Sequence, residues 1–157
     1  MGASRELLRQ SGQDAMAAAE EQDSWDLVRG LDEQHAARIA QIHADFFEQH
    51  QPAERAAVQA ERRALEKQLG EVACLMVAGG HIGVLLHRMQ LFDLLALWGD
   101  RPVIAWSAGA MALSERVVLF HDEPPQGSSW AEVMEAGFGL LPDLVALPHA
   151  RHRLQTD

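Results

Sequence analysis

The sequence contains a single cysteine and no apolar stretch near the length of a membrane span. Cys74 has no second cysteine with which to form an internal disulfide, and a lone thiol in an apolar segment is typical of a small buried side chain. A membrane span needs about 18 consecutive apolar residues, so we expect no membrane association. Positive charge is also scarce, since 13 Lys and Arg accompany 23 Asp and Glu. Nucleic acid requires a cationic surface, so the net charge of −10 argues against that partner too.

The first residues carry neither the apolar core of a signal peptide nor a myristoylation signal. We therefore expect a cytoplasmic protein. At 157 residues and 48% apolar composition, the chain is large enough to bury a hydrophobic core. Because neither nucleic acid nor a membrane is expected as a partner, a small molecule or a peptide is the expected ligand.

Residues 1–70 show no convincing strand and predict a helical N-terminal segment. Residues 4–21 are rich in good helix formers, and a short second helix is expected to end at Gly30. Apolar residues then recur at helical spacing over residues 31–50, and again over residues 53–69 after a proline. A helical hairpin or bundle is the predicted arrangement.

Three histidines in this segment invite a metal-site interpretation. His35 and His43 are two helical turns apart, however, and no cysteine or carboxylate at helical spacing completes a ligand set with them and His50. Solvated or packing histidines are the favoured interpretation, so the sequence predicts no metal and no other cofactor.

From residue 71 onward, short apolar runs alternate with helical patterns. Strands are predicted over residues 71–78, 103–106, 116–120 and 142–147, and helices over residues 81–98, 108–114 and about 129–137. This alternation predicts an α/β fold in which a parallel sheet of about four strands is flanked by helices and preceded by the helical segment. The predicted domains are thus residues 1–70 and 71–157.

The most informative stretch runs from Ala105 to Gly109, where an apolar strand candidate ends at Ser107 and small residues begin a helix. This is the pattern of a nucleophile elbow, in which a tight turn exposes the serine hydroxyl. The usual motif has glycine two residues before the serine, where this chain has Ala105. An ordinary junction whose serine caps the helix is the alternative.

The predicted strands end in groups that together make a hydrolytic site. In a parallel sheet these ends meet at one edge, which would collect Ser107, Asp122 and His149. Ser107 is the candidate nucleophile, His149 its general base, and Asp122 the carboxylate that orients the imidazole. Glu123 competes with Asp122 for the third role, and His121 is an alternative base.

Backbone N–H groups are the candidates for binding an oxyanion. Ala108 and Gly80 are the preferred donors and Gly79 is less favoured, because glycine lets the main chain approach a substrate closely. The candidate substrate-binding residues are His81, Arg151 and Arg153, since an arginine can hold a substrate carboxylate.

A competing motif lies in the same region. Residues 78–83 follow a strand candidate and open a helix, one residue short of a dinucleotide-binding fingerprint. That fold requires an acidic residue at the end of the next strand, where this chain has Ser107. Nucleotide binding is therefore disfavoured.

Several of these motifs resemble those of the dipeptidase E and cyanophycinase family of serine peptidases, relatives of the class I glutamine amidotransferases. The resemblance covers about residues 71–157 and rests on residues 77–81, the Trp-Ser-Ala-Gly-Ala segment at 106–110, the His-Asp pair at 121–122 and the Leu-Pro-His segment at 147–149. It implies a flavodoxin-like, amidotransferase-like sheet and the serine, histidine and aspartate roles given above. It also implies short aspartate-containing peptides as substrates.

The chain departs from the family pattern in ways that leave a second hypothesis. Residues 1–70 resemble none of the family's first strands, and the family's domain normally continues beyond the histidine, so we expect a domain truncated at its C-terminus. The main prediction is a serine-type peptidase acting through an acyl-enzyme. The alternative is a catalytically degenerate binding or interaction module. Four strands would leave exposed edges, which predicts a homo-oligomer.

Overall fold

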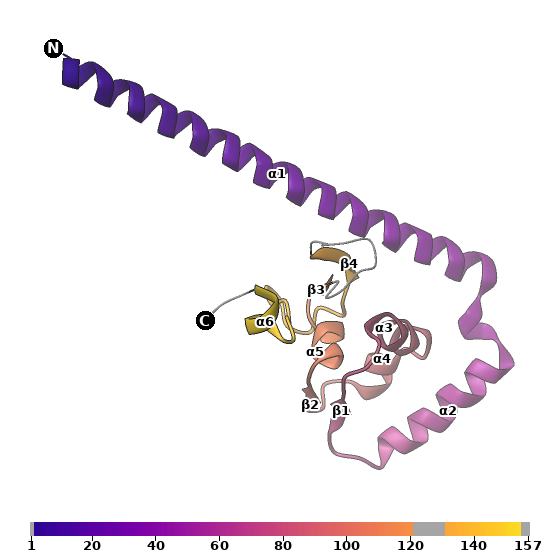
Figure 1. Cartoon of the computed structure of the whole chain (residues 1–157). Helices are drawn as coiled ribbons and strands as arrows, with labels where there is room; N and C mark the ends of the chain where they lie inside the picture. Colours follow the sequence, from indigo (N-terminus) through magenta and orange to yellow (C-terminus); the bar gives the residue numbers. More distant parts are fainter. Residues whose placement is uncertain (1, 121–130, 155–157) are drawn as a thin grey trace.

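A computed structural model describes residues 2–120 and 131–154 of the chain. A long helix, α1 (Gly2–His50), runs past a smaller body formed by the remaining elements (Figure 1). In chain order these are η1 (Pro52–Glu54), α2 (Ala56–Gly70), β1 (Leu75–Val77), α3 (Ile82–Leu91), α4 (Leu94–Trp98), β2 (Val103–Ala105), α5 (Ala108–Leu113), β3 (Arg116–Leu119), β4 (Glu132–Ala136) and α6 (Ala150–Leu154). The described chain is therefore mostly helical.

Helix α1 is continuous through Gly30, where the sequence predicts an end. A glycine inside a helix costs only about 1 kcal/mol, and the good helix formers on both sides outweigh that cost. The helix ends where Gln51 adopts a left-handed conformation with φ 40° and Pro52 begins η1. Its C-terminal part packs against β4, whereas apolar residues nearer the N-terminus, including Trp25 and Leu31, are exposed. Within the described ranges, no helix has both the length and the apolar character needed to cross a membrane.

The strands form two separate pairs. β1 and β2 are parallel, with Leu75 opposite Val103, while β3 and β4 are antiparallel with a register shift between Val117 and Val118. The two pairs are not joined into one sheet. The prediction of a parallel sheet of about four strands flanked by helices, flavodoxin-like and amidotransferase-like, is therefore wrong.

Two segments account for this correction. Residues 142–147, predicted as the fourth strand, form none, and the pairing nearest to them is an isolated parallel bridge between Ser114 and Leu141. Conversely, β4 lies in the segment predicted as a capped helix. It pairs with β3 on one side and contacts α1, and such contacts override a weak local preference for helix.

The hydrophobic core lies between α3, α5 and the strands β1 and β3. Its most buried members are Val77, Leu86, Met89, Met111, Ala112, Leu113 and Val117. Helix α5 approaches the end of β1 so closely that a Cβ on Gly109 would lie 2.1 Å from the carbonyl oxygen of Val77. Only glycine allows this approach, so the core fixes the positions of the carboxyl ends of β1 and β2 relative to each other.

Candidate functional site

Ser107 occupies the turn between β2 and α5 in a backbone conformation that serine rarely adopts. Its φ is 54° and its ψ is −129°, a region that costs a residue other than glycine about 1–3 kcal/mol. Its carbonyl oxygen accepts a hydrogen bond from the N–H of Met111 at 3.1 Å, which starts the helix. Its side chain makes no capping hydrogen bond. The alternative in which Ser107 merely caps α5 is therefore wrong.

The loop after β1 lies directly against this serine. A Cβ on Gly79 would be 2.9 Å from the Oγ of Ser107 and 3.0 Å from its Cβ. Gly80, the next residue, has a φ of 146°, which side chains strongly disfavour. The two glycines thus let the main chain pass the hydroxyl at close range.

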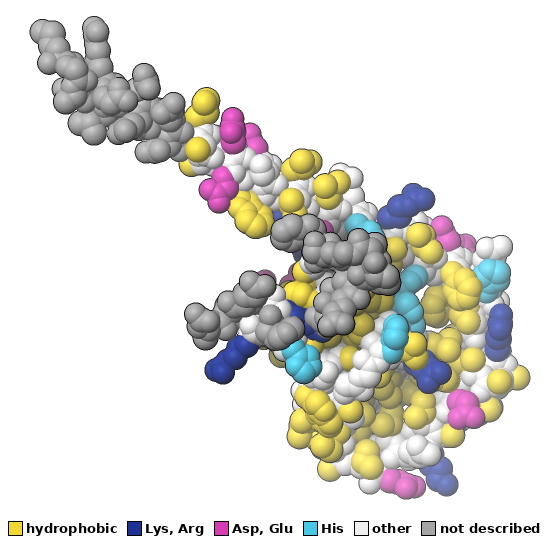
Figure 2. Space-filling model, in the orientation of Figure 1, with side chains coloured by type: hydrophobic (Ala, Val, Ile, Leu, Met, Phe, Trp, Pro, Cys, Tyr) yellow, Lys and Arg dark blue, Asp and Glu magenta, His cyan; other side chains and the backbone are white. Residues whose placement is uncertain are grey.

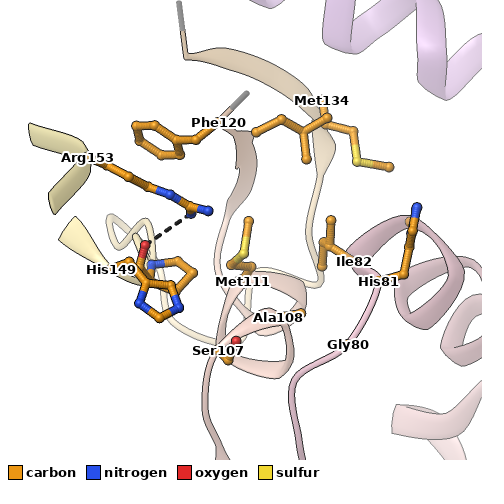
Figure 3. Close-up of a pocket in the computed structure, with 13 residues that line it drawn as sticks. Gly80, His81, Ile82, Ser107, Ala108, Met111, Phe120, Met134, His149 and Arg153 are labelled. Carbon is orange, nitrogen blue, oxygen red and sulfur yellow. Dashed lines mark hydrogen bonds between the residues drawn. The ribbon is translucent and has the colours of Figure 1, made fainter. Parts of the chain in front are cut away.

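Ser107 and His149 line the same cavity, which has a volume of about 460 Å³ (Figure 3). Gly80 and Ala108 also line it, so one preferred oxyanion donor from each loop lies beside the serine. Gly79 contacts Ser107 but does not line the cavity. The apolar part of the wall consists of Ile82, Met111, Leu119, Phe120 and Met134.

The backbone at His149 is also left-handed, with a φ of 60°. Its carbonyl oxygen accepts a hydrogen bond from the N–H of Arg153 at 3.1 Å, which starts α6. Figure 3 shows its imidazole at the end of the cavity where Ser107 lies. Both residues lie within the described ranges, and no hydrogen bond joins them. Such bonds are often long before substrate binds and tighten in the complex.

Two of the three candidate substrate-binding residues line the cavity. The guanidinium of Arg153 lies 5.0 Å from the centre of the Phe120 ring, and its Nη1 donates a hydrogen bond to the carbonyl oxygen of Pro148 at 3.1 Å. His81 lies on the opposite wall, where its Nδ1 accepts a hydrogen bond from the N–H of Val84 at 3.4 Å (Figure 3). Arg151 is exposed and does not line the cavity.

The third member of the predicted triad lies outside the described residues. This applies to Asp122 and equally to the alternatives His121 and Glu123. The described chain reaches the cavity wall at Phe120. The roles of these residues stay predictions.

The sequence did not indicate two parts of the cavity wall. Phe120 directly precedes the His-Asp pair and is the last residue of the strand predicted over residues 116–120. Its position beside the site therefore follows from that motif. No feature of the sequence indicated that Met134 lines the cavity. Its segment has the pattern of a capped helix, whereas in the structure it is part of β4. Its position depends on pairing with a strand distant in the sequence.

The chain matches no protein-family model, and no curated protein or solved structure is detectably similar to it. The function of the chain is therefore inferred from the geometry of the cavity and from the motifs themselves.

The backbone strain at Ser107 can be tested without a substrate. Replacing Ser107 by glycine should relieve the positive φ, whereas replacing it by alanine should not. We expect Ser107→Gly to be more stable than Ser107→Ala by about 1–2 kcal/mol in urea unfolding. At Ala110, within α5, the ordinary order should hold, and Ala110→Gly should lower stability by about 1 kcal/mol. A Ser107→Gly variant less stable than Ser107→Ala would contradict the described turn.

Proposed function

We propose that the chain is a serine-type peptidase that cleaves short, aspartate-containing peptides at the cavity containing Ser107. The observation that carries the proposal is the conformation of Ser107, which is strained, makes no capping bond and borders a cavity shared with His149. Strain of this kind persists only where surrounding contacts impose it, and it is concentrated at functional sites.

The proposed reaction has two stages. Ser107 Oγ attacks the scissile carbonyl carbon while His149 removes the hydroxyl proton, and the resulting oxyanion is bound by the N–H groups of Ala108 and Gly80. Collapse of this intermediate breaks the C–N bond, and His149 returns the proton to the leaving amine. A water molecule, deprotonated by His149, then hydrolyses the acyl-enzyme and regenerates Ser107. Asp122 is the proposed carboxylate that orients the imidazole.

The chemistry of the wall supports an acidic substrate. Arg153 is the basic residue among the described lining residues and has further partners besides Phe120 and Pro148. Its guanidinium is held against Phe120 and Pro148, which limits its freedom before a ligand arrives. A fixed guanidinium suits a carboxylate, because it offers a planar pair of N–H donors.

One observation favours the non-enzymatic alternative. Within the described residues, the hydroxyl of Ser107 and the imidazole of His149 share a cavity without a hydrogen bond. A catalytically degenerate module would retain the cavity for binding and would lack the activated nucleophile. The peptidase and the binding module therefore differ in the reactivity of the Ser107 hydroxyl.

A fluorophosphonate probe measures that reactivity directly. We expect the probe to label the wild-type protein once per chain and to leave Ser107→Ala unlabelled, because only an activated serine reacts with it. His149→Ala should react at least about 100-fold more slowly, since it lacks the general base. Ser24→Ala, which changes an exposed serine of α1, is the control and should be labelled as the wild type is. Folded wild-type protein that stays unlabelled would support the binding module instead.

The substrate class has its own test. Removing the charge in Arg153→Gln should raise KM for an aspartate-containing dipeptide by roughly 10- to 100-fold, the value of one charge-assisted hydrogen bond. KM for a neutral dipeptide should change little. Arg151→Gln removes the same charge from an exposed position outside the cavity and is the matched control. Equal effects of Arg153→Gln on both dipeptides would contradict recognition of the carboxylate.

We also propose a cytoplasmic homo-oligomer. The two strand pairs are not joined to each other, and the apolar side chains of Met76 and Ile104 on the β1–β2 pair are exposed, which supports contact with a second copy. Sedimentation at micromolar concentration should show a dimer or a larger species. A monodisperse monomer would rule out the homo-oligomer.

A further inference from the structure

A second group of reactive side chains lies away from the Ser107 cavity. His43 comes from α1, His87 from α3 and Glu135 from β4, and one ligand atom from each lies within 4.8 Å of the others. Nε2 of His87 is 2.7 Å from Oε1 of Glu135, and Nδ1 of His43 is 3.5 Å from Oε2. Two helices that are distant in the sequence thus each bring a histidine to the carboxylate of β4.

The burial of Glu135 makes this convergence unusual. Only 4% of the residue is exposed, and a buried carboxylate is costly unless it is paired or binds a metal. In the parts of the chain that the structure describes, no lysine or arginine forms a salt bridge with it. Its side-chain partners are the two imidazoles, which in neutral form are metal ligands.

We propose that His43, His87 and Glu135 bind a divalent transition metal, with Zn²⁺ as the ion that the donor set fits best. Two imidazole nitrogens and one carboxylate oxygen are a known ligand set for zinc, with bonds of about 2.0–2.2 Å. Ligand atoms of a tetrahedral site are then roughly 3.3 Å apart. The present contacts of 2.7 Å and 3.5 Å go to different oxygens of Glu135, and one ligand atom from each residue lies within 4.8 Å of the others, so the side chains must shift to surround the ion.

The site leaves room for a fourth ligand. His43 and Glu135 border a cavity of about 340 Å³ beside α1, and His43 and His87 border a neighbouring, more apolar cavity of about 450 Å³. The two imidazole side chains are 34% and 46% exposed, and Figure 2 shows histidine side chains gathered on the face where α1 meets the body. Three protein ligands with an accessible fourth position bind water or an external ligand, as in catalytic rather than structural zinc sites.

The proposed site differs from the Ser107 site in position and in chemistry. Met134 lines the Ser107 cavity, whereas its neighbour Glu135 belongs with His43 and His87, and these three residues are called the histidine group below. Successive residues of a strand face opposite sides, so β4 separates the two sites. Metal binding is therefore testable whether or not Ser107 is catalytic.

The test is titration of chelator-treated, full-length protein with Zn²⁺ in competition with a chromophoric chelator. We expect one Zn²⁺ per chain with a micromolar or lower Kd. His87→Ala and His43→Ala should each weaken binding by at least about 100-fold, because each removes a direct ligand. His50→Ala and His81→Ala change histidines outside the group and should alter Kd less than about threefold.

Cobalt provides a second measurement that does not depend on variants. Co²⁺ bound to the wild-type protein should show the intense visible absorption of a four- or five-coordinate site with nitrogen and oxygen ligands, and Zn²⁺ should displace it. Absence of Zn²⁺ binding by folded wild-type protein would overturn the proposal. Binding that survives in both His43→Ala and His87→Ala would also overturn it, and the group would then be a hydrogen-bonded anchor between α1 and the body.

Discussion

The structure depends on the contact between α5 and the carboxyl end of β1. At Gly109 the two main chains are so close that a Cβ would lie 2.1 Å from the carbonyl oxygen of Val77. Helix α5 cannot move away without exposing Met111 and Leu113, which are 6% and 5% exposed. Burial of each such side chain is worth about 1.5–3 kcal/mol, which offsets the strain at Ser107 of about 1–3 kcal/mol. The core therefore holds the serine in a conformation that it would otherwise avoid.

The sequence predicted this part of the molecule because its signals are local. An apolar run stopped by glycines marks β1, and another stopped by Ser107 and small residues marks the turn into α5. The small side chains needed at a cramped turn can be recognised without knowing the rest of the fold. His149 lines the cavity as well, although the strand over residues 142–147 that was expected to place it there does not form.

The arrangement of strands could not be predicted in the same way. β4 has the composition of a capped helix, and it becomes a strand because β3 supplies hydrogen bonds and α1 supplies a packing surface. Gly30 has the character of a helix end, and α1 continues through it. A metal site was disfavoured from His35, His43 and His50 alone, whereas in the structure His43 lies near His87 of α3 and Glu135 of β4. For β4 and for the group of His43, His87 and Glu135, the deciding contacts join residues far apart in the sequence.

Strand β4 is the element that relates the two proposed sites. Because side chains alternate along a strand, Met134 closes the apolar wall of the Ser107 cavity while Glu135 accepts the contacts of His43 and His87 on the other face. His35 adds a hydrogen bond from the same long helix, with its Nε2 3.1 Å from the carbonyl oxygen of Met134. Helix α1 thus contacts β4 at the main-chain carbonyl of Met134 and at the buried carboxylate of Glu135. Helix α1 therefore holds the strand that walls the Ser107 cavity, although it contributes none of the described residues that line that cavity.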